Sequence, residues 1–275
     1  MAVDEDNGTL LGEVTGIDGA HGTAVAPATG HGFATSGNDQ SVVMFDLKSF
    51  KRLGRIPAAE DADAIIYDSA SNRVFTFNGD AHSSTVIDPD GKLIASIPLG
   101  GKPEYGASAG DGKVYANLTD SSEVVEIDAK AATVVRRWST APCKQPVSMA
   151  IDTAHHRLFS GCRSGSMAVS DYQAGKVVAT VPIGKGVDGA GFDAASGDAF
   201  ASNADGTLTV IHHDTPDQYH VVENLPTAQG ARNMGLDPTN HRIFIVSGKF
   251  GPAPAGGRGR GPVLPGSFAV MVIER

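Results

Sequence analysis

The sequence predicts an all-β fold of the β-propeller class, in which four-stranded antiparallel blades repeat along the chain. Three observations support this prediction. A short segment with a central aromatic residue recurs six times. Each period contains short runs of alternating or β-branched residues, separated by turn-forming residues, and no segment has helical periodicity. Repeats of about 40–50 residues with four strands each are typical of propeller blades.

The recurring aromatic residue lies in the predicted second strand of each repeat, as in RVFTFN and RIFIVS. Successive aromatics are 40 to 44 residues apart, and they are Phe33, Phe75, Tyr115, Phe159, Phe200 and Phe244. We therefore expect one monomeric propeller domain over residues 1–275. Its repeats are expected at about 19–58, 61–101, 102–142, 143–186, 187–227 and 228–275.

The second repeat shows the expected strands most clearly, at 64–68 (AIIYD), 73–78 (RVFTFN), 84–88 (STVID) and 93–99 (LIASIPL). The segments Ser-Ala-Ser-Asn and Pro-Asp-Gly between them suit tight turns, because Asn, Asp and Gly tolerate turn conformations. The same order of four strands is expected in the other repeats.

The last repeat has only three predicted strands, and the N-terminus offers a fourth. TLLGEVT at 9–15 matches KVVATVP at 176–182, the fourth strand of an earlier repeat. We expect this N-terminal strand to close the last of six blades, since closure leaves no sheet edge bare. Residues 2–4 also align with the end of a third strand, and DEDNG after them matches the turn between third and fourth strands.

The segments FTFN at 75–78 and YAN at 115–117 are degenerate copies of the YVTN motif, and the strand endings RIPA, SIPLGGKP and TVPIGKG fit the same repeat. Over essentially its whole length the chain resembles the YVTN-repeat (YncE-like) bacterial β-propellers. The resemblance implies a periplasmic or secreted protein. It also implies seven blades, so we expect an upstream segment to be missing before Met1.

Charge and hydropathy exclude several classes of partner. The net charge of −9 disfavours a nucleic-acid backbone or an anionic membrane surface, since both need a basic patch. No apolar run approaches the ~18 residues of a membrane helix. The start MAVDEDNG does not fit a secretory signal.

One mouth of the propeller channel is predicted to carry a ring of polar residues. The position five residues before the end of each first strand is ionisable in five repeats. In the fourth repeat it is Val147, and Gln145 just before it reaches the same space. The candidate ligand-binding residues are His21, Asp63, Glu104, Gln145, Asp188 and Arg232. Strand packing gives no reason for such residues there.

Three interpretations of this ring stay open. A divalent metal ion, the candidate cofactor, would take Asp63, Glu104, Asp188 and His21 as ligands. A zwitterionic small molecule would place a carboxylate on Arg232. A solvated rim of compensating charges needs no ligand. An insert at 249–266, with Arg258 and Arg260, is either a lid over the channel or a solvated loop.

The two cysteines, Cys143 and Cys162, are expected at the same face of the fourth blade. A disulfide between them would fit an oxidising compartment, and two buried thiols are the alternative. The pairs His155-His156 and His212-His213 lack the spacing of a third ligand and are interpreted as surface residues.

The function predicted from these features is non-catalytic. The propeller would bind a small ligand, a metal or a protein partner at its channel face. The alternative is a metal-dependent hydrolase or lactonase that uses the carboxylates and histidine at the channel mouth. Binding of single-stranded DNA is disfavoured by the acidic balance and by the single tryptophan, Trp138.

Overall fold

The computed structural model describes residues 1–252 and 261–274, and the central part of the predicted lid, with Arg258 and Arg260, lies outside these residues. Sheets dominate the described chain, whose one helical element is a 3-10 turn, Gly37–Asp39. None of the described helices is long and apolar enough to cross a membrane. The chain forms two compact units, Met1–Ser139 and Thr140–Arg275.

The first unit contains three four-stranded antiparallel sheets. Their strands are β3 (Thr23–Ala26), β4 (His31–Ser36), β5 (Ser41–Asp46), β6 (Arg52–Pro57); β7 (Ala62–Asp68), β8 (Arg73–Asn78), β9 (Ser83–Ile87), β10 (Leu93–Pro98); β11 (Pro103–Ser108), β12 (Lys113–Leu118), β13 (Glu123–Asp128) and β14 (Thr133–Ser139). Strand order in each sheet follows the chain, so each sheet is a meander of hairpins.

The second unit contains two four-stranded sheets and one three-stranded sheet among the described residues. Their strands are β15 (Pro146–Asp152), β16 (Arg157–Cys162), β17 (Ser166–Asp171), β18 (Lys176–Pro182); β19 (Val187–Asp193), β20 (Asp198–Asn203), β21 (Thr207–Thr215), β22 (Gln218–Pro226); β23 (Met234–Asp237), β24 (Arg242–Ser247) and β25 (Ala269–Ile273). Each of the six sheets falls inside one predicted repeat. The fold is an all-β propeller with six blades, as the sequence predicts.

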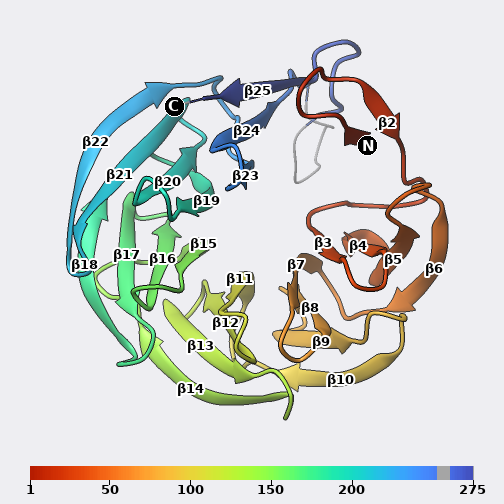
Figure 1. The fold of residues 1–275 in the computed structure, drawn as a ribbon, viewed down its shortest axis with the longest axis horizontal. Coiled ribbons are helices and arrows are strands. Elements are labelled where there is room, and N and C mark those ends of the chain that lie inside the picture. Colours follow the sequence, from red (N-terminus) through yellow and green to blue (C-terminus); the bar gives the residue numbers. More distant parts are fainter. Residues whose placement is uncertain (253–260, 275) are drawn as a thin grey trace. The chain divides into compact units, whose positions relative to one another are not determined.

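Within each unit the blades follow one another along an arc (Figure 1). The first strands β3, β7 and β11 contact one another on its inner side, as do β15, β19 and β23 in the second unit. The fourth strands β6, β10 and β14 lie on the outer side of the first arc. The turns that join the first to the second strand therefore collect at one end of the blades, which is where the candidate site lies.

The N-terminal strand differs from the expectation. β2 (Leu10–Gly12) pairs with β1 (Ala2–Val3), and the sheet of β23, β24 and β25 has three strands among the described residues. The reason lies in the turn: one carboxylate oxygen of Asp4 accepts the backbone N–H groups of Asp6 and Asn7 at 3.0 and 3.1 Å. The same hydrogen bonds form at Asp171 between β17 and β18. Residues 2–12 are thus a third-to-fourth-strand hairpin, as their sequence match predicts.

The recurring aromatic residue is buried in five of the six repeats, and Phe244 of the sixth is partly exposed. Phe33, Phe75, Tyr115 and Phe159 are fully buried, and Phe200 is nearly so. Phe33 packs in one cluster with Val74 and Ile87 of the next blade. Burying a phenylalanine side chain contributes about 1.5–3 kcal/mol, so the periodic aromatics stabilise the contacts between successive blades as well as the blades themselves.

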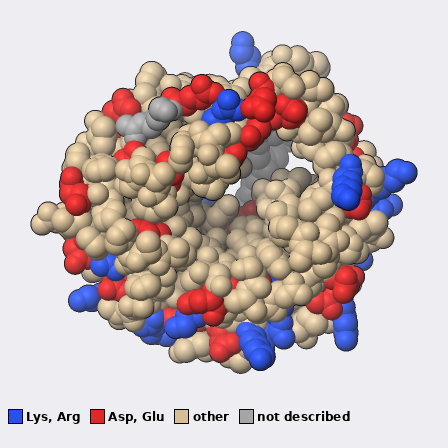
Figure 2. All heavy atoms as spheres, in the orientation of Figure 1, with Lys and Arg blue, Asp and Glu red and all other residues tan. Residues whose placement is uncertain are grey.

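Cys143 and Cys162 are joined by a disulfide with Cα atoms 5.8 Å apart. The bond links the loop before β15 to the end of β16, within the fourth blade. Both cysteines are fully buried. On the face drawn in Figure 2, acidic and uncharged side chains separate the lysines and arginines, which do not gather into one patch.

A buried aspartate ends the first strand of three blades and holds the turn that follows. Carboxylate oxygens of Asp68, Asp152 and Asp193 accept the backbone N–H groups of Ser71 (2.8 Å), Ala154 (3.0 Å) and Ala195 (3.1 Å). All three aspartates are at most 4% exposed. Aspartate favours such turns because its short side chain reaches backbone donors two or three residues ahead.

The second strand begins with a residue that reaches the next blade. Arg73 donates hydrogen bonds from Nη1 to the carbonyl oxygens of Ala129 (2.8 Å) and Lys130 (2.9 Å). At the equivalent position of the fourth blade, Nε of Arg157 donates to the carbonyl of Pro216 at 2.8 Å. These contacts tie each blade to the turn between the third and fourth strands of its neighbour.

Replacing Arg73 by methionine should lower the free energy of unfolding by about 1–3 kcal/mol, because the buried carbonyl of Ala129 loses its charged donor. Methionine keeps most of the apolar stem. Urea unfolding followed by circular dichroism measures the change. Lys92→Met, at an exposed position, is the control and should leave stability within about 0.5 kcal/mol. Equal stability of the two variants would contradict the role of Arg73.

Candidate metal centre

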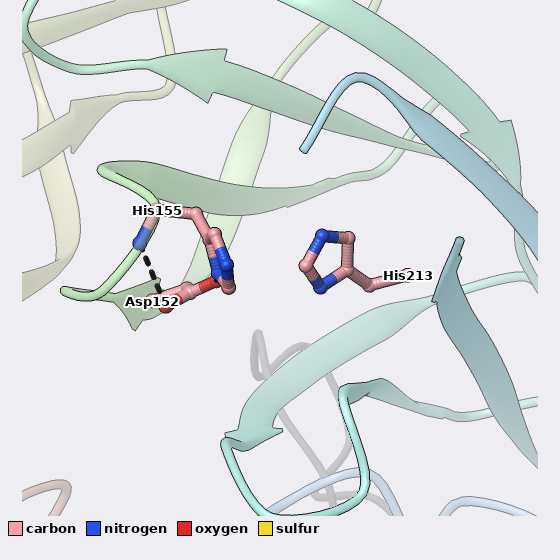
Figure 3. Close-up of side chains that lie close together, drawn as sticks. All are labelled: Asp152, His155 and His213. Atoms are coloured by element: carbon pink, nitrogen blue, oxygen red, sulfur yellow. Dashed lines mark hydrogen bonds and ion pairs between the residues drawn. The ribbon is translucent and has the colours of Figure 1, made fainter. Parts of the chain in front are cut away.

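Three side chains from two neighbouring blades of the second unit meet at the turn end of the blades (Figure 3). Asp152 is the last residue of β15, His155 lies in the turn after it, and His213 lies in β21 of the next blade. One ligand atom from each side chain lies within 4.8 Å of the other two. Within residues 1–252 and 261–274, this is the one group of three metal-ligating side chains at such spacing.

Asp152 is fixed before any ligand arrives. It is 2% exposed, and its Oδ1 accepts the backbone N–H groups of Ala154 (3.0 Å) and His155 (3.2 Å). Its Oδ2 lies 2.7 Å from Nδ1 of His155. The turn that Asp152 caps therefore also sets the position of the His155 imidazole. That side chain is 44% exposed.

His213 enters the group from the opposite side. Its ring faces that of His155 with centroids 4.6 Å apart, and Tyr219 stacks on it at 5.6 Å. The hydroxyl of Tyr219 donates to the carbonyl of Pro216 at 2.8 Å, which holds the phenol in place. Nε2 of His213 is buried and has no hydrogen-bond partner. A buried polar atom without a partner costs about 1–3 kcal/mol, so this nitrogen needs an explanation.

Burial sets the protonation of the site. It lowers the pKa of His213 below its usual range, and the nearby His155 lowers it further. The imidazole is thus neutral at neutral pH, which is the form that binds metal ions. Burial also raises the pKa of Tyr219, so the phenol stays protonated.

The donor set suits a divalent transition metal ion. Two imidazoles and one carboxylate are common ligands of zinc, at about 2.0–2.2 Å from the metal. A tetrahedral ion at that distance needs ligand atoms about 3.3 Å apart. The present upper limit of 4.8 Å exceeds this value by about 1.5 Å, so a bound ion would require the three side chains to move closer together.

The residues predicted to line the channel mouth are divided between the two units. In the first unit, Nδ1 of His21 lies 3.2 Å from Oδ1 of Asp63. Burial, followed by the charge of Asp63, raises the pKa of Tyr105, which neighbours the predicted Glu104. The structure thus brings the His21 imidazole and the Asp63 carboxylate together, and it places Glu104 in β11 of the adjacent blade.

In the second unit, Nε of Arg232 lies 3.1 Å from Oδ2 of Asp188. Gln145 has a left-handed backbone, φ 57°, and its carbonyl accepts the N–H of Arg163 at 3.0 Å. Ligand binding by the six positions, and metal binding by Asp63, Glu104, Asp188 and His21, stay predictions. The ion pair of Arg232 and Asp188 compensates part of this charge inside the second unit, and Asp63 has the imidazole of His21 as a neighbour in the first unit.

The sequence analysis missed His155 and His213, which it interpreted as surface residues. The two histidines are 58 positions apart, in neighbouring repeats, so local residue spacing cannot indicate that they meet. One signal was present. A histidine three residues after the strand-ending aspartate lies on the aspartate's own turn, and a histidine at the end of a third strand lies near the neighbouring blade's turn.

Comparisons with known proteins support the fold and go no further. No protein-family model matches the chain, and no curated protein matches it. A solved structure described as Kuenenia stuttgartiensis hydrazine synthase is similar, with a TM-score of 0.68 and 16% sequence identity. The match covers 84% of this chain and 77% of that one. At this identity the similarity concerns the fold alone.

Acid should destabilise the protein partly through His213. In the unfolded chain a histidine takes up a proton near pH 6.5, and the folded state resists protonation because the pKa of His213 is lowered. The unfolded state then binds more protons, so the stability that neutral His213 contributes is present above pH 6.5 and lost as the pH falls below it.

The variant His213→Phe keeps an aromatic ring against Tyr219 and removes the titrating group. It should lose less stability than the wild type between pH 7.5 and pH 5.5, measured by urea unfolding. The control is His82→Asn, at an exposed position with φ 49° that asparagine tolerates. If His213→Phe and the control show the same acid sensitivity as the wild type, His213 does not contribute.

Proposed function

We propose that this propeller is a non-catalytic binding protein that holds a divalent transition metal ion, of the zinc type, at Asp152, His155 and His213. The observation that carries the proposal is the convergence of ligand atoms from two imidazoles and a carboxylate within 4.8 Å of one another, at a histidine whose buried Nε2 has no hydrogen-bond partner. A bound cation would supply the missing partner. It would also give the three side chains a common role.

The structural role of Asp152 does not account for the whole group. Aspartates at equivalent positions, such as Asp68 and Asp193, cap their turns in the same way. Turn formation therefore explains the carboxylate and leaves both imidazoles unexplained. The stacked Tyr219 and the hydrogen bonds to Asp152 also restrict the ligands before binding, which lowers the entropy lost when an ion binds.

Zinc binding is tested by isothermal titration calorimetry of the purified protein after dialysis against a chelator. The wild type should bind one zinc ion at this site. His155→Ala, at a half-exposed position, and Asp152→Asn, which keeps an oxygen for the turn, should each weaken binding about 100-fold or more, because each loses one of three ligands.

The matched control is His156→Asn. His156 is the adjacent imidazole, pairs with the hydroxyl of Tyr172 at 3.2 Å, and has φ 60°, which asparagine accepts. It should bind zinc as the wild type does. Unchanged zinc affinity in His155→Ala and Asp152→Asn would overturn the proposal.

Metal-dependent hydrolysis is the second candidate function, and the number of ligands favours it. Three protein ligands leave a fourth position for water on a tetrahedral zinc ion, as in catalytic zinc sites. The test is hydrolysis of a chromogenic ester and of a simple lactone by the zinc-loaded protein. A rate that exceeds that of His155→Ala by at least tenfold would support hydrolysis, and equal rates would leave binding as the function.

A second element of the proposal concerns location and the channel face. We propose a periplasmic or secreted protein, and the disulfide between Cys143 and Cys162 supports it because such bonds persist in oxidising compartments. The resemblance to YncE-like propellers supports the same location. At the channel mouth, the pair of Asp188 and Arg232 offers both charges that a zwitterionic ligand or a protein partner needs.

A further inference from the structure

One buried arginine joins the two segments that supply the histidines of the proposed metal centre. Arg157 begins β16, two residues after His155, and its side chain is 9% exposed. A buried guanidinium needs partners for its charge and for its N–H donors, because leaving them unpaired is costly. The partners of Arg157 therefore show which parts of the second unit it holds together.

On its own blade, Arg157 holds the turn that carries His155. Its Nη1 donates to the carbonyl oxygen of His155 at 2.7 Å and to that of His156 at 3.2 Å, and lies 3.4 Å from Oδ2 of Asp171. Oδ1 of Asp152 accepts the backbone N–H of His155 at 3.2 Å. The backbone of His155 is thus bound at its N–H by a proposed ligand and at its carbonyl by Arg157.

On the neighbouring blade, Arg157 holds the tip of the β21–β22 hairpin. Its Nε donates to the carbonyl of Pro216 at 2.8 Å, and its Nη2 donates to Oδ1 of Asp217 at 2.8 Å. The carbonyl of Pro216 also accepts the hydroxyl of Tyr219, whose ring stacks on His213. One carbonyl thus connects Arg157 with the side chain that packs on the His213 imidazole.

The β21–β22 hairpin is longer than its counterparts. β21 and β22 have nine residues each, and the described third and fourth strands of the other five blades have five to seven. His212 lies opposite Asp198, the first residue of β20. Asp171, the last residue of β17, lies opposite Arg157 in the same way. The extension therefore begins at His213, and it includes the stacked tyrosine and the tip that the arginine binds.

We propose that Arg157 is a positioning residue of the metal centre, which fastens the extended hairpin to the turn of the fourth blade so that His155 and His213 face one ion. This inference rests on the proposed zinc site. Arg157 is not itself a ligand, because a guanidinium has no acceptor. Its planar group presents donors in fixed directions, so it sets the distance between the two segments that it bonds.

The second blade provides a matched comparison. Arg73 also begins a second strand and donates to two backbone carbonyls of the next blade. Two residues before it stands Ser71, where the fourth blade has His155. The contact between blades is therefore shared by both arginines, and only Arg157 lies beside histidines that could bind a metal ion.

Zinc affinity, measured by isothermal titration calorimetry after dialysis against a chelator, tests the inference. Arg157→Met should weaken zinc binding by about 10–100-fold, as is typical when a residue that orients metal ligands is lost. Arg73→Met should bind zinc as the wild type does. Should Arg157→Met fail to fold, Arg157→Lys keeps the positive charge without the planar group and should weaken binding about tenfold.

Wild-type zinc affinity in a folded Arg157 variant would overturn the inference. An equal loss of affinity in Arg73→Met would overturn it as well, because the effect would then follow from weaker contacts between blades in general.

A second measurement needs no zinc. The rings of His155 and His213 have centroids 4.6 Å apart and face each other (Figure 3), so their ring protons should show a nuclear Overhauser effect in the wild type and in Arg73→Met. The effect should be lost in the Arg157 variants, and its retention there would overturn the inference. Absence of zinc binding by the wild type would instead overturn the proposed function, while the Overhauser effect still decides whether Arg157 positions the two imidazoles.

Discussion

The buried carboxylate at the end of the first strand is the interaction on which much of this structure depends. Asp68, Asp152 and Asp193 each accept backbone hydrogen bonds from the turn that follows. The same carboxylates face the next blade, where Asp68 accepts a hydrogen bond from the hydroxyl of Ser108 at 2.6 Å and Asp193 pairs with His241. One side chain thus forms the turn and also contributes to the contact between blades.

This double role accounts for where the candidate metal centre lies. A carboxylate that must stay buried and ionised needs partners, and the neighbouring blade supplies them. In the first unit the partner is a hydroxyl, and in the second unit the partners are imidazoles. Where the partner is an imidazole in place of a hydroxyl, the same backbone position gains a neighbour that can bind a metal ion.

Much of the fold could be predicted from the sequence because its signals are local. The aromatic residue of each second strand, such as Phe75 or Phe159, recurs at a nearly constant interval, and five of the six prove to be buried. The hairpin at Asp4 could also be predicted, because its sequence matches that of the turn at Asp171, and the two aspartates form the same hydrogen bonds. The pairing partner of β2 was harder to predict, because the sequence pattern of a strand does not show which strand lies beside it.

The candidate metal centre was beyond prediction for a physical reason. His155 and His213 acquire meaning only through packing between blades, and each alone resembles a surface histidine of a turn or strand end. The channel-mouth residues show the converse. Their pattern was conspicuous in the sequence, yet Asp63 and Asp188 each have a cationic or imidazole partner within their own unit, so a conspicuous charge pattern is not by itself evidence of an empty ligand site.

The end of β21 has a consequence for how this protein can change over time. Successive side chains of a strand point to opposite sides, so His212 pairs with Asp198 and His213 stacks on Tyr219 beside His155 only while the register of β21 is kept. Deleting a single residue between Thr207 and Ile211 would exchange the two directions and disrupt both sets of contacts at once. Sequence drift in this strand is therefore restricted to substitutions, and the length of the turn at Thr215 to Gln218 is restricted as well, because the carbonyl of Pro216 accepts hydrogen bonds from Arg157 and Tyr219.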